Sequence, residues 1–221
     1  MKTKTRFALV AALMLGISLT VNGQVLSYGA RLGMGFPGFI NEEIGSQRIT
    51  LATSLIGSLR ITDGFQVMVE AGYQRKGNKF TNQYWDAQGA VVEDSTYLVK
   101  TNMDYINIPL YLRLNLGGAN KFYIQAGGYY GYLLFANFTG MRSGELVSKV
   151  PYREGLAVHD FGIVAGGGIE TPIRPGLSIA LDLKYYIGLK DLNRNPLIIG
   201  HSNPVKNKGL TMCMGFLVDV E

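Results

Sequence analysis

Apolar and polar residues alternate along most of the chain after Gln24, as in β-strands whose two faces meet different surroundings. The alternation is clearest in Tyr105–Asn115 and Leu177–Lys190. Six weaker segments follow the same pattern: Val25–Phe36, Leu51–Ile61, Phe65–Lys76, Lys121–Ala136, Asp160–Thr171 and Gly209–Val220. The pattern predicts an all-β fold, an eight-stranded antiparallel up-and-down transmembrane β-barrel.

The links between these segments alternate between long and short. The short links are rich in turn residues: Thr62–Gly64, Leu116–Asn120 and Pro172–Gly176. The long links are Pro37–Thr50, Gly77–Asp104, Asn137–His159 and Asp191–Lys208. Bacterial outer-membrane barrels have short periplasmic turns and longer extracellular loops. We therefore expect both termini on the periplasmic side.

Charged residues lie almost entirely on one face of each segment. Apart from Arg75, next to the end of Phe65–Lys76, none of the eight apolar faces contains Asp, Glu, Lys or Arg. A charge at mid-depth on a lipid-facing surface costs about 2–4 kcal/mol, so a membrane would select this segregation. A soluble lipocalin-type barrel, with its apolar face inside, is the alternative fold. Glycines such as Gly127, Gly131 and Gly166 on the polar face favour a narrow interior over a solvated surface.

Charges on the inner face of a narrow barrel need partners, because an unpaired charge in a low-dielectric interior is costly. Two groups of residues are expected to form paired layers, and a proton or ion path is the alternative role for them. The upper group is Arg31, Glu70, Asp182 and Lys184, and the lower group is Arg60, Arg113, Glu170 and Asp219. Eight strands enclose a bore that side chains fill, which predicts a closed barrel rather than a diffusion pore.

The N-terminus has the pattern of a secretory signal peptide. A basic start, Met1–Arg6, precedes the apolar run Phe7–Val21, with small residues before Gln24. We expect residues 1–23 to be cleaved and residues 24–221 to form the barrel in the bacterial outer membrane. Cleavage would lower the formal charge from +5 to +2. No basic run then remains in the sequence, which argues against nucleic-acid binding.

The sequence contains no catalytic, cofactor or metal signature, and neither an enzyme nor a bound cofactor is expected. His159 and His201 fall in long links without fixed partners. Cys213 is the single cysteine, so no intramolecular disulfide forms. Tyr84 and Trp85 lie together in the longest link, either as an anchor for loop packing or as a recognition hot spot.

Four strand motifs resemble the outer-membrane β-barrel (PorT-like) family of Bacteroidetes. The segment Asp104–Arg113 is similar to its Y-x-x-I/V-P-L-x-L-K/R strand, including the proline at Pro109. The other three are Gly72–Gly77, Phe161–Glu170 and Leu181–Leu189. One departure is the end of the chain, Val218–Glu221, which lacks the terminal aromatic that assists insertion by the outer-membrane assembly machinery.

The resemblance implies an outer-membrane barrel, with an accessory role in protein secretion as one possible activity. From the residues themselves, we expect a closed structural or surface-interaction protein that acts through its extracellular loops. A small-solute porin and a soluble lipocalin-like carrier are weaker alternatives. The expected partners are membrane lipid and lipopolysaccharide, the assembly machinery, and surface or secretion proteins.

Overall fold

The computed structural model describes residues 25–40, 45–83, 96–194 and 204–220. Ten strands and one short 3₁₀ helix make up this part of the chain: β1 (Val25–Ile40), β2 (Thr50–Thr62), β3 (Phe65–Lys76), β4 (Lys79–Asn82), β5 (Tyr97–Leu116), β6 (Lys121–Arg142), β7 (Glu145–Pro151), η1 (Arg153–Gly155), β8 (His159–Arg174), β9 (Leu177–Gly188) and β10 (Lys206–Val220). The predicted signal peptide lies outside the described residues.

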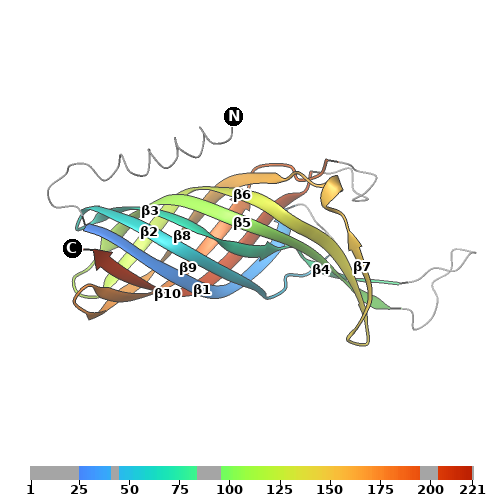
Figure 1. Ribbon diagram of the computed structural model, residues 1–221, viewed down its shortest axis with the longest axis horizontal. Coiled ribbons are helices and arrows are strands. Elements are labelled where there is room, and N and C mark those ends of the chain that lie inside the picture. The colour runs from blue at the N-terminus through green and yellow to red at the C-terminus, as the bar shows by residue number, and fades with distance from the viewer. Residues whose placement is uncertain (1–24, 41–44, 84–95, 195–203, 221) are drawn as a thin grey trace, which may run out of the picture.

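Eight of the strands close into a ring, which confirms the predicted barrel (Figure 1). The ring order is β1, β2, β3, β5, β6, β8, β9 and β10, and every neighbouring pair is antiparallel. Pairing of β1 with β10, from Leu26 opposite Val220 to Ile40 opposite Lys206, completes the closure. The start of β1, the end of β10 and the three short turns therefore lie at one end, the short-turn end.

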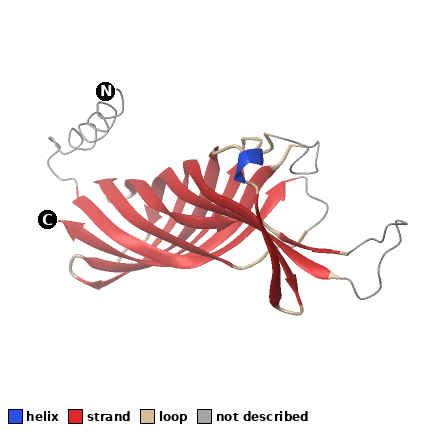
Figure 2. Ribbon diagram, turned by 45° about the vertical axis from the view of Figure 1, so that its right-hand side comes forward, coloured by secondary structure: helices blue, strands red, loops and turns tan. Residues whose placement is uncertain are grey.

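The opposite end, which we call the long-hairpin end, extends further than the sequence pattern predicts. Two links that the pattern predicts as loops, Gly77–Asp104 and Asn137–His159, contain strands β4 and β7 and the outer parts of β5 and β6. These strands pair in the order β4, β5, β6, β7 and project beyond the ring (Figure 2). Pairing satisfies backbone N–H and C=O groups of both long links. We call this four-stranded extension the outer sheet.

Most outward side chains of the ring are apolar, whereas most of its charged side chains face inward, together with buried apolar residues such as Met68 and Val164. Leu55 and Leu110 are 69% and 56% exposed, whereas Arg113 and Asp160 are fully buried. A soluble barrel has the reverse arrangement, so the lipocalin-like alternative is wrong. The outward apolar side chains form a continuous band around the ring, the apolar belt, which suits a hydrocarbon environment. No helix in the described residues is long and apolar enough to cross a membrane.

Close approach of neighbouring strands explains why glycine is frequent on the inner face. A Cβ atom at Gly127 would lie 2.1 Å from the carbonyl oxygen of Leu110, and one at Gly72 would lie 2.0 Å from that of Thr53. Neither position can take a side chain unless the backbone moves. The strong curvature of an eight-stranded wall therefore depends on these glycines.

Replacing Gly127 by alanine should lower the free energy of unfolding by about 1–3 kcal/mol, because the added methyl group collides with the neighbouring strand. The adjacent Gly128 supplies the control, since a Cβ there would meet only the carbonyl oxygen of Gly162, at 3.6 Å. Urea unfolding in lipid vesicles, followed by loss of the fast-migrating folded band on unheated gels, measures both variants. Equal destabilisation by Gly127→Ala and Gly128→Ala would contradict the close-approach explanation.

Replacing Leu110 by lysine should lower the free energy of unfolding by about 2–4 kcal/mol, because it places a charge at the middle of the apolar belt. Leu146 of β7 is a matched control, since it is 62% exposed against 56% for Leu110 but lies in the outer sheet. Leu146→Lys should leave stability within about 0.5 kcal/mol of the wild type. The same vesicle unfolding assay compares them, and equal effects would show that the belt does not contact lipid.

Candidate functional site

The centre of the barrel interior holds four charged side chains from three strands. Arg31 of β1 forms ion pairs with Glu70 of β3 and, at 2.8 Å, with Asp182 of β9. Lys184, also on β9, lies 2.8 Å from Glu70 and 3.6 Å from Asp182. The Tyr111 hydroxyl donates to Glu70 and accepts from Arg31. All four charged side chains are at most 3% exposed, and their formal charges cancel. We call this group the central cluster.

The lower group that the sequence suggested separates into two pairs near the short-turn end. Arg113 donates to Glu170 at 2.8 Å, and its guanidinium lies 3.6 Å from the centre of the Tyr123 ring. Arg60 lies 3.4 Å from Asp219, and this pair is partly exposed, with side-chain exposures of 18% and 30%. The two pairs therefore differ in how strongly solvent screens them.

Another buried ion pair lies toward the long-hairpin end and was not singled out from the sequence. Lys76 of β3 lies 2.9 Å from Asp160 of β8, and its ammonium group sits over the rings of Tyr105 and Tyr129 at 4.7 and 4.5 Å. Asp160 also accepts a hydrogen bond from Asn207 at 2.8 Å. Both residues carry charge on the polar face of their strands, which is the only sequence signal for the pair.

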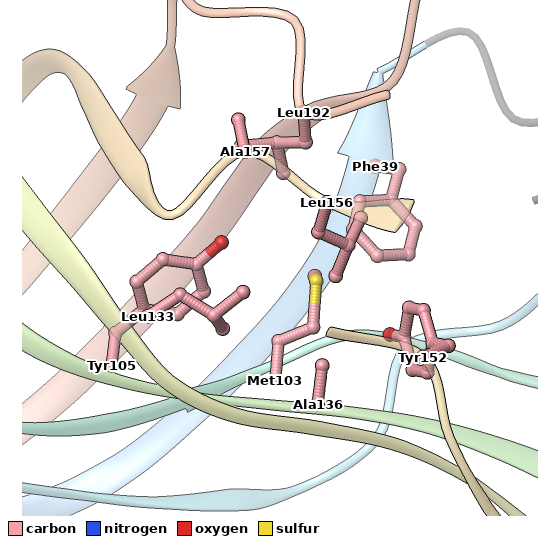
Figure 3. Close-up of a cluster of buried hydrophobic side chains, with 9 residues drawn as sticks. All are labelled: Phe39, Met103, Tyr105, Leu133, Ala136, Tyr152, Leu156, Ala157 and Leu192. Carbon is pink, nitrogen blue, oxygen red and sulfur yellow. The ribbon is translucent and has the colours of Figure 1, made fainter. Parts of the chain in front are cut away.

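An apolar cluster covers the interior at the long-hairpin end. Its buried residues come from β1, β5, β6 and the connecting segments, and Figure 3 shows their side chains gathered around Met103: Phe39, Met103, Tyr105, Leu133, Ala136, Tyr152, Leu156, Ala157 and Leu192. Backbone hydrogen bonds hold the connecting segments in place, from Leu133 N to Val158 O and from Ala157 N to Leu192 O, both at 2.8 Å. We call this cluster the apolar cap.

A small cavity with polar and apolar lining lies between the central cluster and the apolar cap. Its volume is about 30 Å³, and Glu70, Gln74, Asn107 and Lys184 are among the residues that line it. This space has room for one or two water molecules. Side-chain oxygens of Gln74 and Asn107 have no protein partner and offer acceptors to such waters. The cavity is much too small for a solute such as a sugar or an amino acid.

The outer sheet presents exposed apolar residues beyond the barrel ring. Every residue of β7 is exposed, and Leu146, Val147 and Val150 are 62%, 53% and 55% exposed. A hollow of about 410 Å³ is lined by residues of β4, β5, β6 and the β6–β7 turn, together with Thr96 but without any residue of β7: Thr81, Thr96, Leu98, Lys100, Met141, Ser143 and Gly144. This end therefore combines exposed apolar side chains with a concave surface.

The rim between the outer sheet and the apolar belt carries paired charges on β3 and β5. Arg75 lies 2.6 Å from Asp104, which also accepts a hydrogen bond from the Tyr73 hydroxyl at 2.6 Å. Arg48, in the link between β1 and β2, donates to Thr101 O at 3.0 Å. Burial, and then the neighbouring Arg75, lower the pKa of Arg48.

The structure describes only some of the remaining residues noted in the sequence. Tyr84, Trp85 and His201 lie outside the described residues. His159 is exposed, and its Nδ1 lies 2.6 Å from the Tyr130 hydroxyl. Among the described residues, no group of three or more His, Cys, Asp or Glu side chains could hold a metal ion.

Comparison with known families identifies the barrel. A family described as "Outer membrane protein beta-barrel domain" matches residues 18–194. The chain belongs to this family. It is therefore an outer-membrane β-barrel protein, as the outward apolar belt indicates. The match does not distinguish a PorT-like branch or a Bacteroidetes origin. A search of curated protein sequences gave no match.

Solved structures with a similar fold include two outer-membrane proteins. Neisserial surface protein A has a TM-score of 0.50 at 11% sequence identity, and the alignment covers 89% of this chain and 99% of that one. A major outer membrane protein from Thermus thermophilus also has a TM-score of 0.50, at 12% identity, with coverage of 90% and 100%. At these identities the likeness shows the fold alone.

Replacing Glu70 by alanine should lower the free energy of unfolding by about 3–5 kcal/mol, because it leaves Arg31 and Lys184 buried without their carboxylate. Asp219→Ala is the matched control, since it removes a carboxylate from a partly exposed pair and should cost less than about 1 kcal/mol. Urea midpoints in lipid vesicles compare the two variants. An unchanged midpoint for Glu70→Ala would refute the structural role of the central cluster.

Proposed function

We propose that this outer-membrane barrel is an interaction protein that binds a partner protein through its outer sheet. In this proposal the barrel anchors and positions the sheet, and it neither conducts solutes nor catalyses a reaction. The observation that carries the proposal is the contrast between the barrel lumen and the outer sheet. The lumen is filled by ion pairs and an apolar cap, whereas β7 exposes Leu146, Val147 and Val150 beyond the belt.

The filled lumen argues against a porin-like role. The central cluster, the Lys76–Asp160 pair and the apolar cap follow one another toward the long-hairpin end, and the cavity between them holds only about 30 Å³. A solute path would require these buried ion pairs to separate, which leaves charges uncompensated in a low-dielectric interior. Binding outside the lumen requires no such cost.

The surface of β7 has the composition of a protein-binding site. Its apolar residues are interspersed with the charged residues Glu145 and Lys149, and all are exposed. Apolar side chains surrounded by polar ones are typical of protein interfaces, and exposed apolar patches of this kind mark interaction sites. The partner chemistry that fits is a protein surface with an apolar patch bordered by charges.

The orientation in this proposal places the outer sheet outside the cell. The short-turn end carries the start of β1 and the end of β10, and in outer-membrane barrels short turns face the periplasm. Export would follow cleavage of residues 1–23 as a signal peptide. The proposal covers a partner secreted past the barrel as well as one met at the cell surface, so it includes the secretion-accessory role.

A photo-cross-linking amino acid placed at Val150 should yield discrete protein adducts in intact cells, because this residue lies on the proposed interface. The same substitution at Leu55 is the matched control, since Leu55 is 69% exposed but lies in the apolar belt facing lipid. Mass spectrometry of the purified adducts identifies the partner. Folding of both variants is checked by gel mobility without heating.

Two results would count against the proposal. Absence of any protein adduct from Val150 and from Leu146, in variants that fold and reach the outer membrane, would show that the outer sheet has no stable partner. Adducts of the same proteins from Leu55 would show that cross-linking reports crowding in the membrane and not a specific surface.

A further inference from the structure

Three lysines lie on the outside of the barrel where the apolar belt ends on the long-hairpin side. Lys206 and Lys208 belong to β10, and Lys190 follows β9. Side chains alternate along a strand, so Lys206 and Lys208 share the outward face of Leu210. Asn207, between them, is only 2% exposed and points inward. We call the three residues the lysine triad.

The lysine triad lies at the height expected for lipid headgroups. Lys208 is opposite Ile187 of β9 in the register, and Leu210 is opposite Tyr185. The outward residues of β9 up to Ile187 are apolar, beginning at Leu177 next to the short turn. About ten residues of a tilted strand cover an apolar band about 25 Å tall. The lysines therefore begin where the hydrocarbon region ends.

No acidic side chain in the described residues forms an ion pair with the lysine triad, and the exposed Asp191 is the acidic residue next to Lys190 in sequence. None of the ion pairs of the described chain includes Lys190, Lys206 or Lys208. Asp191, next in sequence, instead accepts backbone N–H groups of Asn193 and Val205 through its Oδ1, at 3.0 and 2.9 Å. On the β3–β5 side of the rim, Asp104 neutralises the guanidinium of Arg75.

The position of Lys190 is set by an aromatic neighbour. Its ammonium group lies 5.7 Å from the centre of the Phe161 ring, on the outward face of β8. Phe161 is 49% exposed and belongs to the apolar belt. A cation over an aromatic ring at the edge of the hydrocarbon is held at the level of the headgroups. The geometry thus directs one ammonium group toward the lipid side of the rim.

We propose that the lysine triad binds the phosphate group of a phosphorylated lipid in the adjacent leaflet. Lysine is a flexible point charge that binds phosphate, and basic sites beside a membrane recognise anionic headgroups. Lys206 and Lys208 start about 7 Å apart along the strand, so both ammonium groups can reach one phosphate. The site lies on the barrel wall and does not depend on a partner of the outer sheet.

The test is lipid selection by the purified, folded barrel. The full protein in detergent is mixed with equal amounts of phosphatidic acid and phosphatidylcholine, and native mass spectrometry counts the lipids that remain bound. The wild type should retain phosphatidic acid preferentially. The triple variant K190Q/K206Q/K208Q should reduce this preference by about tenfold or more, because each lysine beside an anionic headgroup strengthens binding several-fold.

Two further variants separate a specific site from general charge. K121Q/R142Q/R174Q removes the same number of positive charges at the short-turn ends of β6 and β8 and in the outer sheet, and it should keep the preference within about twofold, because charges more than a Debye length away contribute little. K190R/K206R/K208R keeps the charges and should also retain the preference. Loss of preference in the first of these variants would show that net charge, and not the triad, selects the lipid.

A soluble anion is distinguished from a lipid by competition. Millimolar inorganic phosphate should leave phosphatidic acid bound, because the acyl chains contact the apolar belt below the lysines. Displacement of the lipid by free phosphate at comparable concentration would assign the site to a soluble anion and overturn the proposal. Equal retention of phosphatidic acid by wild type and K190Q/K206Q/K208Q would overturn it as well.

Discussion

The structure depends on neutralising the charges that the wall encloses. Lipid around the barrel excludes charge from the outward positions, so each strand places its charged residues inside, where the bore is narrow and water is scarce. The central cluster meets this constraint with two cations, Arg31 and Lys184, each of which pairs with both Glu70 and Asp182. The ion pairs among β1, β3 and β9 link these strands across the interior, and their side chains also fill the lumen.

The filled lumen is the reason why we place the proposed interaction on the outer surfaces of the protein. Above the central cluster, the Lys76–Asp160 pair and the apolar cap occupy the remaining cross-section. The same side chains that stabilise the barrel thus remove the space that a channel would need. The features that distinguish this chain from a simple eight-stranded barrel are the outer sheet and the lysine triad at the rim.

The sequence pattern predicts the features that contact with lipid imposes on the strands. It does not predict the features outside the membrane, where lipid imposes no pattern. Segments such as Tyr105–Asn115 cross the apolar belt, where alternation is obligatory, and their prediction as strands is confirmed. Strands β4 and β7 lie outside the belt, where neither face must be apolar, so no alternating pattern marks them. The pairing of Lys76 with Asp160 depends on the stagger between strands that are distant in sequence, which alternation does not specify.

The features of β7 favour contact through side chains over the addition of another strand. A free strand edge invites pairing with other chains, and proteins protect such edges with charge, proline and bulges. β7 has all three: Lys149, Pro151, and a register shift opposite Gly140 and Met141. These features hinder pairing at the backbone edge of β7 but leave the side chains of Leu146 and Val150 exposed. This combination fits the proposed interface, because it limits self-association through the strand edge and keeps the apolar side chains accessible to a partner.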